Sequence, residues 1–224
     1  MVPRYRLKYI KKDTARYLSH RELMTTLQRA MKRASFPLTY TRGHHPRPKL
    51  SYGPPLGVGV AGLSEYMDLE LDGEISTQEY LQLLNDQLPP GIIAQDLVKL
   101  DPGEMGLGKF INCACYRIEL DSAIFSSIST ISWEQLFIKL EEEHPSFKEG
   151  LLKWCVDPAE GYLEVLMRVG QEGVSVRTLL EALNKGIGTT VLLPTLVTRT
   201  ALFHLEKGLI TDPLIKNTHL LGEK

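Results

Sequence analysis

The chain has 224 residues, with 26 lysines and arginines against 27 aspartates and glutamates, so its formal net charge is −1. Its hydrophobic content of 43% supports a packed core, and its three cysteines are too few for a disulfide framework. No apolar run reaches the roughly 18 residues that span a bilayer, and the first residues lack a hydrophobic secretory segment. These features exclude membrane-spanning and disulfide-scaffold classes, and they predict a cytoplasmic protein that contacts no membrane.

The charge is unevenly distributed along the chain. Thirteen of the 26 basic residues lie in the first fifty positions, beside only two acidic residues, Asp13 and Glu22. The other 174 residues carry 13 basic and 25 acidic side chains, so a basic segment is followed by an acidic one. Such a split indicates either a surface that binds a polyanion or one part of the molecule that neutralises another.

The first hundred residues begin with a strand and a helix. Residues 4–10 alternate between apolar and charged side chains, which is typical of a half-buried strand. Ser19 and Glu22 stand at the spacing of a capping box and predict a helix that ends before Pro37. A second strand is expected at about 36–42, where apolar residues again alternate with threonines.

A loop rich in glycine and proline follows at 43–63, and residues 66–72 alternate as a third strand. Ser76 with Glu79 predicts a second capped helix, and residues 92–100 predict a fourth strand. The element order is therefore β-α-β-β-α-β, which is the ferredoxin-like order.

The same order is repeated after a linker at 101–108. The expected elements are a strand at 112–120, a helix at 132–143 capped by Ser132 with Gln135, a strand pair at 151–156 and 162–169, a helix at 175–183, and a last strand within 190–205. The sequence thus predicts an α+β protein of two tandem ferredoxin-like (βαββαβ) halves with antiparallel sheets. We expect a basic domain at 1–105, with its Gly/Pro-rich loop at 42–63, and an acidic domain at 106–224 that includes a C-terminal tail.

The stretch from Arg42 to Tyr52 is the least ordinary in the chain. It combines three cations with two imidazoles and a phenol on a backbone restricted by glycine and proline. Arginine and lysine bind phosphate, and aromatic rings stack on bases, which together are typical of single-stranded RNA recognition. The plainer alternative is an exposed, solvated basic loop.

A second basic group lies around the start of the first helix. Backbone N–H groups at a helix start attract anions, and neighbouring cations reinforce that effect. The alternative is a solvated helix face with Ser19 only as a cap. Together with the loop, this group completes the predicted nucleic-acid-binding residues: Lys11, Lys12, Arg16, His20, Arg21, Arg42, His44, His45, Arg47, Lys49 and Tyr52.

The cations of the first strand have a different expected role. In a ferredoxin-like sheet the first and third strands are neighbours, so Arg4, Arg6 and Lys8 would lie opposite acidic residues. Opposite charges on adjacent strands attract each other. We therefore expect neutralisation by Asp68, Glu70 and Asp72 rather than direct RNA contact.

The runs 17–24 (YLSHRELM) and 42–49 (RGHHPRPK), with 55–58 (PLGV) and 65–71 (EYMDLEL), resemble the bacterial radical-SAM-linked protein family, a domain of unknown function. Members of that family stand alone or are fused to cobalamin-binding radical S-adenosylmethionine proteins. The resemblance covers about residues 4–100 specifically. It implies a radical S-adenosylmethionine protein as a partner and an association with RNA processing, without an assigned active site.

The sequence therefore favours an RNA-binding accessory protein, with tRNA or rRNA as its RNA, that works beside a radical S-adenosylmethionine RNA-modification enzyme. No catalytic residue, metal ligand or cofactor is predicted, since the C-x₃-C-x₂-C cluster motif is absent and the histidines lack partners at metal-ligand spacing. Two alternatives stay open. One is a metal-independent RNA endonuclease of the tandem ferredoxin-like kind, in which His20, His44 or His45 would act with Tyr52 and Lys49. The other is a protein-docking module that binds no nucleic acid.

Overall fold

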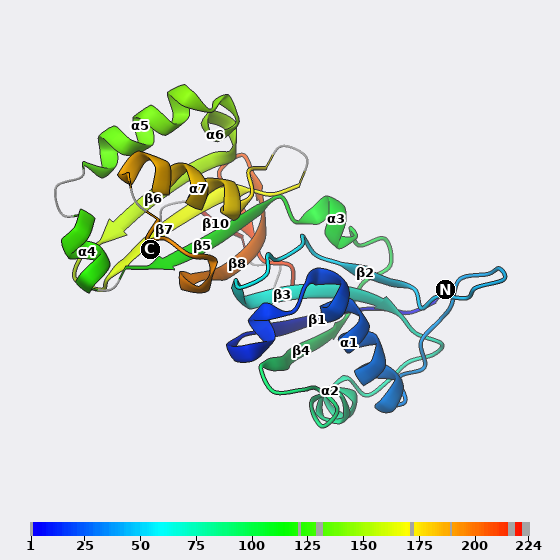
Figure 1. The fold of residues 1–224 in the computed structure, drawn as a ribbon. Coiled ribbons are helices and arrows are strands. Elements are labelled where there is room, and N and C mark those ends of the chain that lie inside the picture. Colours follow the sequence, from blue (N-terminus) through cyan, green and yellow to red (C-terminus); the bar gives the residue numbers. More distant parts are fainter. Residues whose placement is uncertain are drawn as a thin grey trace.

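A computed structural model of the chain describes residues 2–120, 122–128, 132–170, 173–188, 190–214 and 218–220. The protein is a mixed α+β structure in which two lobes lie side by side (Figure 1), as the sequence predicts at the level of fold class. The path of the main sheet is β4-β1-β3-β8-β5-β7-β6, and its pairings are antiparallel except between β3 and β8. None of the helices in these ranges is long and apolar enough to cross a bilayer.

The N-terminal lobe packs two helices against its part of the sheet. Its elements are β1 (Arg4–Lys11), the 3-10 turn η1 (Asp13–Tyr17), α1 (His20–Arg33), β2 (Leu50–Tyr52), β3 (Ala61–Glu70), α2 (Thr77–Asn85) and β4 (Ile92–Lys99). The apolar side chains of β1 pack against the stripe of α1 that contains Leu23, Leu27 and Met31. The capping box of Ser19 and Glu22 is formed, which confirms the predicted start of α1.

The C-terminal lobe has its own core beneath helices on the other side of the molecule (Figure 1). Its elements are α3 (Leu107–Phe110), β5 (Cys113–Glu119), α4 (Ser122–Ile128), α5 (Trp133–Glu143), α6 (Pro145–Gly150), β6 (Leu151–Asp157), β7 (Tyr162–Arg168), α7 (Val176–Ile187), the 3-10 turn η2 (Pro194–Leu196), β8 (Val197–Glu206), β9 (Leu209–Thr211) and β10 (Thr218–Leu220). The predicted pairing of 151–156 with 162–169 is confirmed by the antiparallel ladder of β6 and β7.

The two lobes share a sheet instead of having one each. β3 pairs with β8 in parallel, with Ala61 opposite Thr198 and Gly62 opposite Arg199. The expected separate antiparallel sheets are thus joined into a largely antiparallel one. The more specific expectation of two tandem ferredoxin-like units stays a prediction.

Two local predictions in the N-terminal lobe are wrong. Residues 36–42 do not form a strand, because Leu38 and Tyr40 make only isolated bridges to Leu71 and Pro48. The Thr39 N–H donates to the Glu70 carbonyl and the Arg47 N–H donates to the Thr41 hydroxyl, so these donors do not continue a ladder on either side of the Tyr40–Pro48 bridge. The short strand of this region is instead β2, which lies inside the predicted loop and pairs with β3. The side chain of Ser76, although it precedes α2, makes no cap hydrogen bond.

Candidate functional site

The cations of β1 are largely neutralised within the sheet, as expected for Arg4 and Arg6. The Asp68 carboxylate accepts hydrogen bonds from Arg6 Nε at 2.7 Å and Nη2 at 3.0 Å, and from Arg4 Nη2 at 3.2 Å. Arg6 is 0% exposed, and it also donates to the backbone oxygens of Met105 and Pro213. The linker and a C-terminal segment therefore cover this part of the sheet face, and Arg6 is not available to RNA.

The remaining predicted pairings across β1 and β3 differ from expectation. Glu70 forms its ion pair with Lys49, at 2.7 Å between Nζ and Oε2, and not with β1. Lys8 lies over the ring of Tyr66, 5.9 Å from its centroid. Lys49 is therefore already neutralised in part, which reduces what this predicted site residue can offer a phosphate.

Residues 39–49 form a narrow hairpin that projects from the end of the N-terminal lobe (Figure 1). The Thr41 N–H donates to the Arg47 carbonyl at 2.8 Å, and the Lys49 N–H donates to the Thr39 carbonyl at 2.9 Å. Gly43 adopts a φ of 131°, which glycine tolerates and which turns the chain at the tip. The tip carries exposed cationic and imidazole side chains, namely Arg42, His44, His45 and Arg47.

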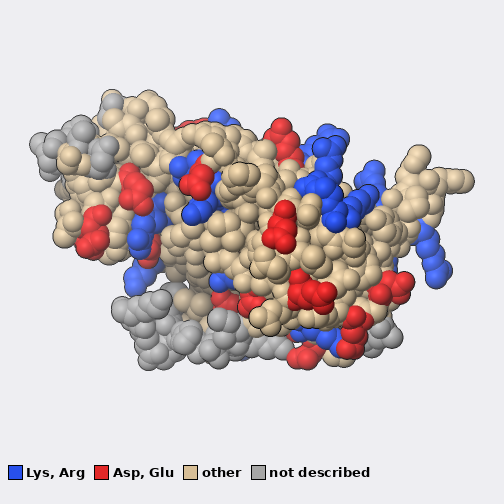
Figure 2. All heavy atoms as spheres, turned by 90° about the horizontal axis from the view of Figure 1, so that it is seen from below, with Lys and Arg blue, Asp and Glu red and all other residues tan. Residues whose placement is uncertain are grey.

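The arginines of the hairpin tip are exposed to solvent and are not neutralised by acidic side chains among the described residues. Within the part of the chain that the structure describes, neither Arg42 nor Arg47 makes an ion pair. In Figure 2 several Lys and Arg side chains gather near the projecting end of the molecule, while Asp and Glu side chains are more frequent along its lower edge. This tip is the part of the predicted site that keeps an unneutralised basic surface.

Tyr40 belongs to the same surface and was missed by sequence reasoning. Its side chain is 42% exposed at the base of the hairpin, and Lys32 Nζ of α1 lies 5.9 Å from its ring centroid. The alternation of residues 36–42 predicted a strand, and in that strand the side chain of Tyr40 would pack against the core and not be available to a ligand. We call the group Lys32, Tyr40, Arg42, His44, His45 and Arg47 the hairpin surface.

The second predicted group, at the start of α1, does not form a comparable site. The Glu22 carboxylate accepts the Ser19 N–H at 2.8 Å, so it occupies the place where an external anion would bind. Lys11 is 0% exposed, and its Nζ donates to the Leu18 carbonyl at 2.7 Å. Burial lowers the pKa of Lys11, and the nearby Glu65 only partly opposes this. Lys11 contributes no exposed charge.

The other residues of this group are dispersed. Lys12 approaches Asp13 at 3.9 Å, Arg16 donates to the Val197 carbonyl at 3.3 Å, and Arg21 is exposed on the first turn of α1. Burial, reinforced by the charge of Arg199, lowers the pKa of His20, which favours the neutral form of its imidazole.

Tyr52, although it follows the hairpin in sequence, lies apart from the tip. Its ring and that of His20 form a T-shaped pair at a centroid distance of 5.9 Å, and burial raises the pKa of Tyr52 to about 12. The predicted set is therefore split into the hairpin tip and the mostly buried or engaged residues near α1.

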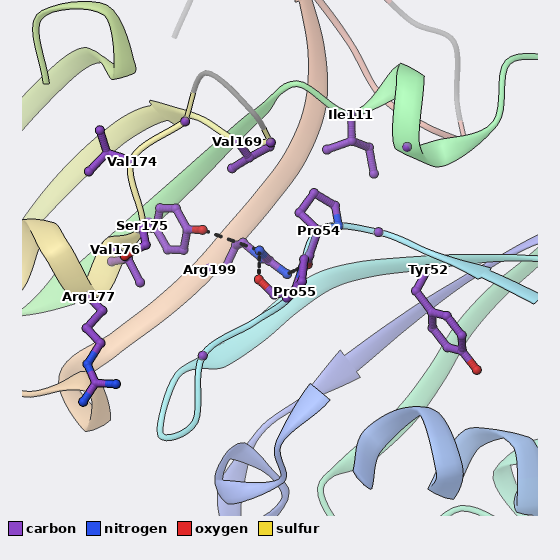
Figure 3. A pocket seen from close by; sticks show the side chains of 16 residues that line it. Tyr52, Pro54, Pro55, Ile111, Val169, Val174, Ser175, Val176, Arg177 and Arg199 are labelled. Carbon is purple, nitrogen blue, oxygen red and sulfur yellow. Dashed lines mark hydrogen bonds between the residues drawn. The ribbon is translucent and has the colours of Figure 1, made fainter. Parts of the chain in front are cut away.

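A cleft of about 450 Å³ lies between the lobes and was not predicted (Figure 3). One wall is the segment Tyr52–Gly57 of the N-terminal lobe; the other includes residues of β5 and β8 with residues 169–170 and 173–177. The fully buried Arg199 fixes the first wall, since its Nη2 donates to the Pro54 carbonyl at 2.8 Å and its Nη1 to the Pro55 carbonyl at 3.3 Å. The Pro54-Pro55 pair between glycines was the sequence signal that could have indicated a rigid wall.

Arg199 is held by Glu65 of β3. Arg199 Nε donates to Glu65 Oε1 at 2.8 Å, Nη2 donates to Oε2, and Glu65 is 3% exposed. Burial alone would lower the pKa of Arg199, but Glu65 and Tyr116 together keep it above its usual value. A side chain at position 62 would collide with Glu65, which explains the glycine there. The pair joins the lobes at the bottom of the cleft.

The three cysteines lie in different environments and share no reactive site among the described residues. Cys113 is buried and Cys115 half-buried, and burial raises the pKa of each to about 11, whereas Cys155 is exposed on β6. Among the described residues no group of three or more His, Cys, Asp or Glu side chains is placed to hold a metal ion.

These environments predict selective alkylation. Because the thiolate is the reactive form, iodoacetamide near pH 8 should modify one thiol per folded chain, Cys155, and all three after denaturation. Peptide mass spectrometry would locate the label, and Cys155→Ser should abolish fast labelling. Rapid modification of Cys113 in the folded protein would contradict the buried position of β5.

Comparison with known proteins identifies a family but no activity. The family described as "Uncharacterized protein conserved in bacteria (DUF2344)" matches residues 4–196. No curated protein matches. Among solved structures, a crystal structure of an unknown protein from Galdieria sulphuraria is similar at 12% identity over 84% of this chain and 95% of that one, with a TM-score of 0.28.

Proposed function

Since the chain belongs to DUF2344, a family of uncharacterized proteins conserved in bacteria, we propose that it is an RNA-binding accessory protein for a radical S-adenosylmethionine RNA-modification enzyme. The observation that carries the proposal is the projecting hairpin surface, where Arg42 and Arg47 are exposed without an ion-pair partner among the described residues. Guanidinium groups bind phosphate in a bidentate manner, and the rings of Tyr40, His44 and His45 provide stacking faces beside them. Tyr40, missing from the initial set, adds to this combination.

The reaction would belong to the partner. This chain lacks the cysteine motif of a radical S-adenosylmethionine enzyme, and the resemblance of residues 4–100 to the radical-SAM-linked family supports a partner of that class. The acidic excess of residues 51–224 would repel RNA, so it favours a lobe that faces protein or solvent while the hairpin faces RNA.

The endonuclease alternative has less support. A general acid and base must lie within hydrogen-bond reach of one substrate atom. His20 and Tyr52 contact each other near α1, His44 and His45 lie at the hairpin tip, and Lys49 is paired with Glu70. The residues that this reaction would need are thus divided between two places.

We also infer that each lobe is a ferredoxin-like unit. The order β4-β1-β3-β2 in the first lobe and β8-β5-β7-β6 in the second both place the fourth strand beside the first and the third beside the second. This shared strand order supports a ferredoxin-like arrangement in both lobes.

The proposal predicts a charge-specific loss of RNA binding. The variant Arg42→Ala/Arg47→Ala should bind bacterial tRNA or rRNA fragments roughly ten-fold or more weakly, and the slope of log affinity against log salt should fall by about 2 if each arginine contacts one phosphate. Electrophoretic mobility shifts at several salt concentrations measure both quantities. Lys139→Ala/Lys148→Ala removes the same charge from exposed positions on α5 and α6 and should change neither.

The outcome also separates the alternatives. No RNA binding by the wild type near 50 mM salt, alone or with the partner enzyme, would refute the proposal and favour protein docking. An equal loss in both double variants would show a general charge effect without a hairpin site. Cleavage of end-labelled RNA by the wild type in the presence of a chelator would instead favour the endonuclease.

A further inference from the structure

We propose that the cleft between the lobes binds a nucleotide, either free or as one unit of an RNA chain. Binding of a nucleotide within an RNA chain rests on the proposed function, whereas binding of a free nucleotide is independent of it. The cleft is separate from the hairpin surface, and of the predicted site residues only Tyr52 lines it.

The size and composition of the cleft fit a small organic ligand. Its volume of about 450 Å³ lies within the roughly 300–1,000 Å³ of small-molecule sites. Most of the wall is apolar and includes rings: Pro54 and Pro55 on one side, with Tyr116 and Val174 from the other lobe. In Figure 3 Pro54 and Ile111 face the space from one side, and Tyr52 turns away toward α1. Such walls pack well against a planar ring.

The charges of the cleft favour an anion. Its charged lining residues are two arginines, Arg177 and Arg199, and no described acidic side chain lines it. Arg199 is buried and compensated by Glu65, so it acts mainly as a support for the wall. Arg177 is mostly exposed, and among the described residues its ion-pair partner is Glu181 at 3.3 Å, a surface pair that costs little to exchange for a ligand. A planar ring between apolar walls with an anionic group near Arg177 is the chemistry of a nucleotide.

The cleft is also preorganised. The carbonyl oxygens of Pro54 and Pro55 are fixed by Arg199, and Arg199 is fixed by Glu65. Proline restricts the same segment further, so binding would order few groups. The walls of the cleft therefore need little rearrangement when a ligand binds.

The test uses the full chain and four probes, AMP, GMP, CMP and UMP, each titrated by calorimetry. At least one should bind with a dissociation constant in the low-millimolar range or tighter. Gly108 lines the cleft, and a Cβ there would meet no atom within 4 Å, so Gly108→Leu places a large apolar side chain at the cleft lining without a collision at its Cβ. We expect this variant to weaken binding roughly ten-fold or more. Lys109→Leu adds the same side chain to α3 at an exposed position outside the cleft and should bind as the wild type does.

Arg177→Gln addresses the anionic group. It should weaken binding of the nucleotide and leave binding of the corresponding nucleoside unchanged. The inference is overturned if none of the four nucleotides binds at about 5 mM, or if Gly108→Leu binds them as well as Lys109→Leu does.

Competition with RNA distinguishes the two sources. A short RNA that displaces the nucleotide from the wild type indicates that the cleft takes a nucleotide of RNA; lack of displacement indicates a free nucleotide. Arg42→Ala/Arg47→Ala should keep mononucleotide binding. Failure of RNA binding with retained, Gly108-dependent nucleotide binding would refute the accessory function and leave the cleft proposal standing.

Discussion

Glu65→Ala is expected to destabilise the protein by roughly 3–5 kcal/mol, because it leaves the guanidinium of Arg199 buried without its carboxylate. Arg199 is 0% exposed and Glu65 3% exposed, so bulk solvent does little to screen the charge that the substitution leaves unpaired. The carbonyl oxygens of Pro54 and Pro55 would remain as acceptors for Arg199, but they carry no full charge. A loss of this size is a large part of the total stability of a typical domain.

Urea denaturation measures this loss as a lower midpoint at an unchanged slope. Glu181→Ala is the matched control, since it breaks the exposed pair with Arg177 and should cost at most about 1 kcal/mol. Replacing both buried partners, in Glu65→Met/Arg199→Met, should recover much of the loss because no charge is then left unpaired. Glu65→Ala at the same midpoint as Glu181→Ala would show that the pair does not hold the lobes together.

Local patterns in the sequence correctly predicted those structural elements that are determined by residues close to one another in the chain. The alternation of 4–10 became β1, and the Ser19–Glu22 spacing became a capping box, because both signals act within a few residues. β2 was missed because three residues in a proline-rich loop become a strand only through their ladder with β3. The pairing of β3 with β8 joins positions more than 130 residues apart, and no local pattern reports it.

The candidate site was predicted in part for the same reason. The hairpin cations could be found from the local sequence, because arginines beside glycine and proline indicate an exposed basic loop without knowledge of any tertiary contact. Composition did not reveal that Lys11 is enclosed by the turn that ends at Leu18, or that Lys49 pairs with Glu70. The cleft requires both lobes, so its residues have no shared motif in the sequence.

Arg6 is the second buried arginine that organises the molecule. Besides Asp68 it binds the backbone oxygens of Met105 and Pro213, and its guanidinium lies 5.7 Å from the ring centroid of Phe110. Arg6 thus holds both the linker between the lobes and a segment near the C-terminus, and Arg4 Nη1 adds a hydrogen bond to the linker at the Glu104 carbonyl, at 2.9 Å. A linker fixed in this way keeps α3, and with it one edge of the cleft, in position.

Arg6→Met should therefore lower the free energy of unfolding by roughly 2–4 kcal/mol, because it leaves two carbonyl groups and part of the Asp68 carboxylate without donors. Arg4 remains on Asp68, so we expect a smaller loss than for Glu65→Ala. Amide hydrogen exchange should quicken first in residues 104–110 while β6 and β7 keep their protection. Lys8→Met, two positions along the same strand, should cost under about 1 kcal/mol and leave the linker protected, since among the described residues the Lys8 ammonium makes no ion pair and lies over the ring of Tyr66. Uniform exchange across both lobes in Arg6→Met would show that the linker is held by other contacts and that Arg6 acts only through global stability.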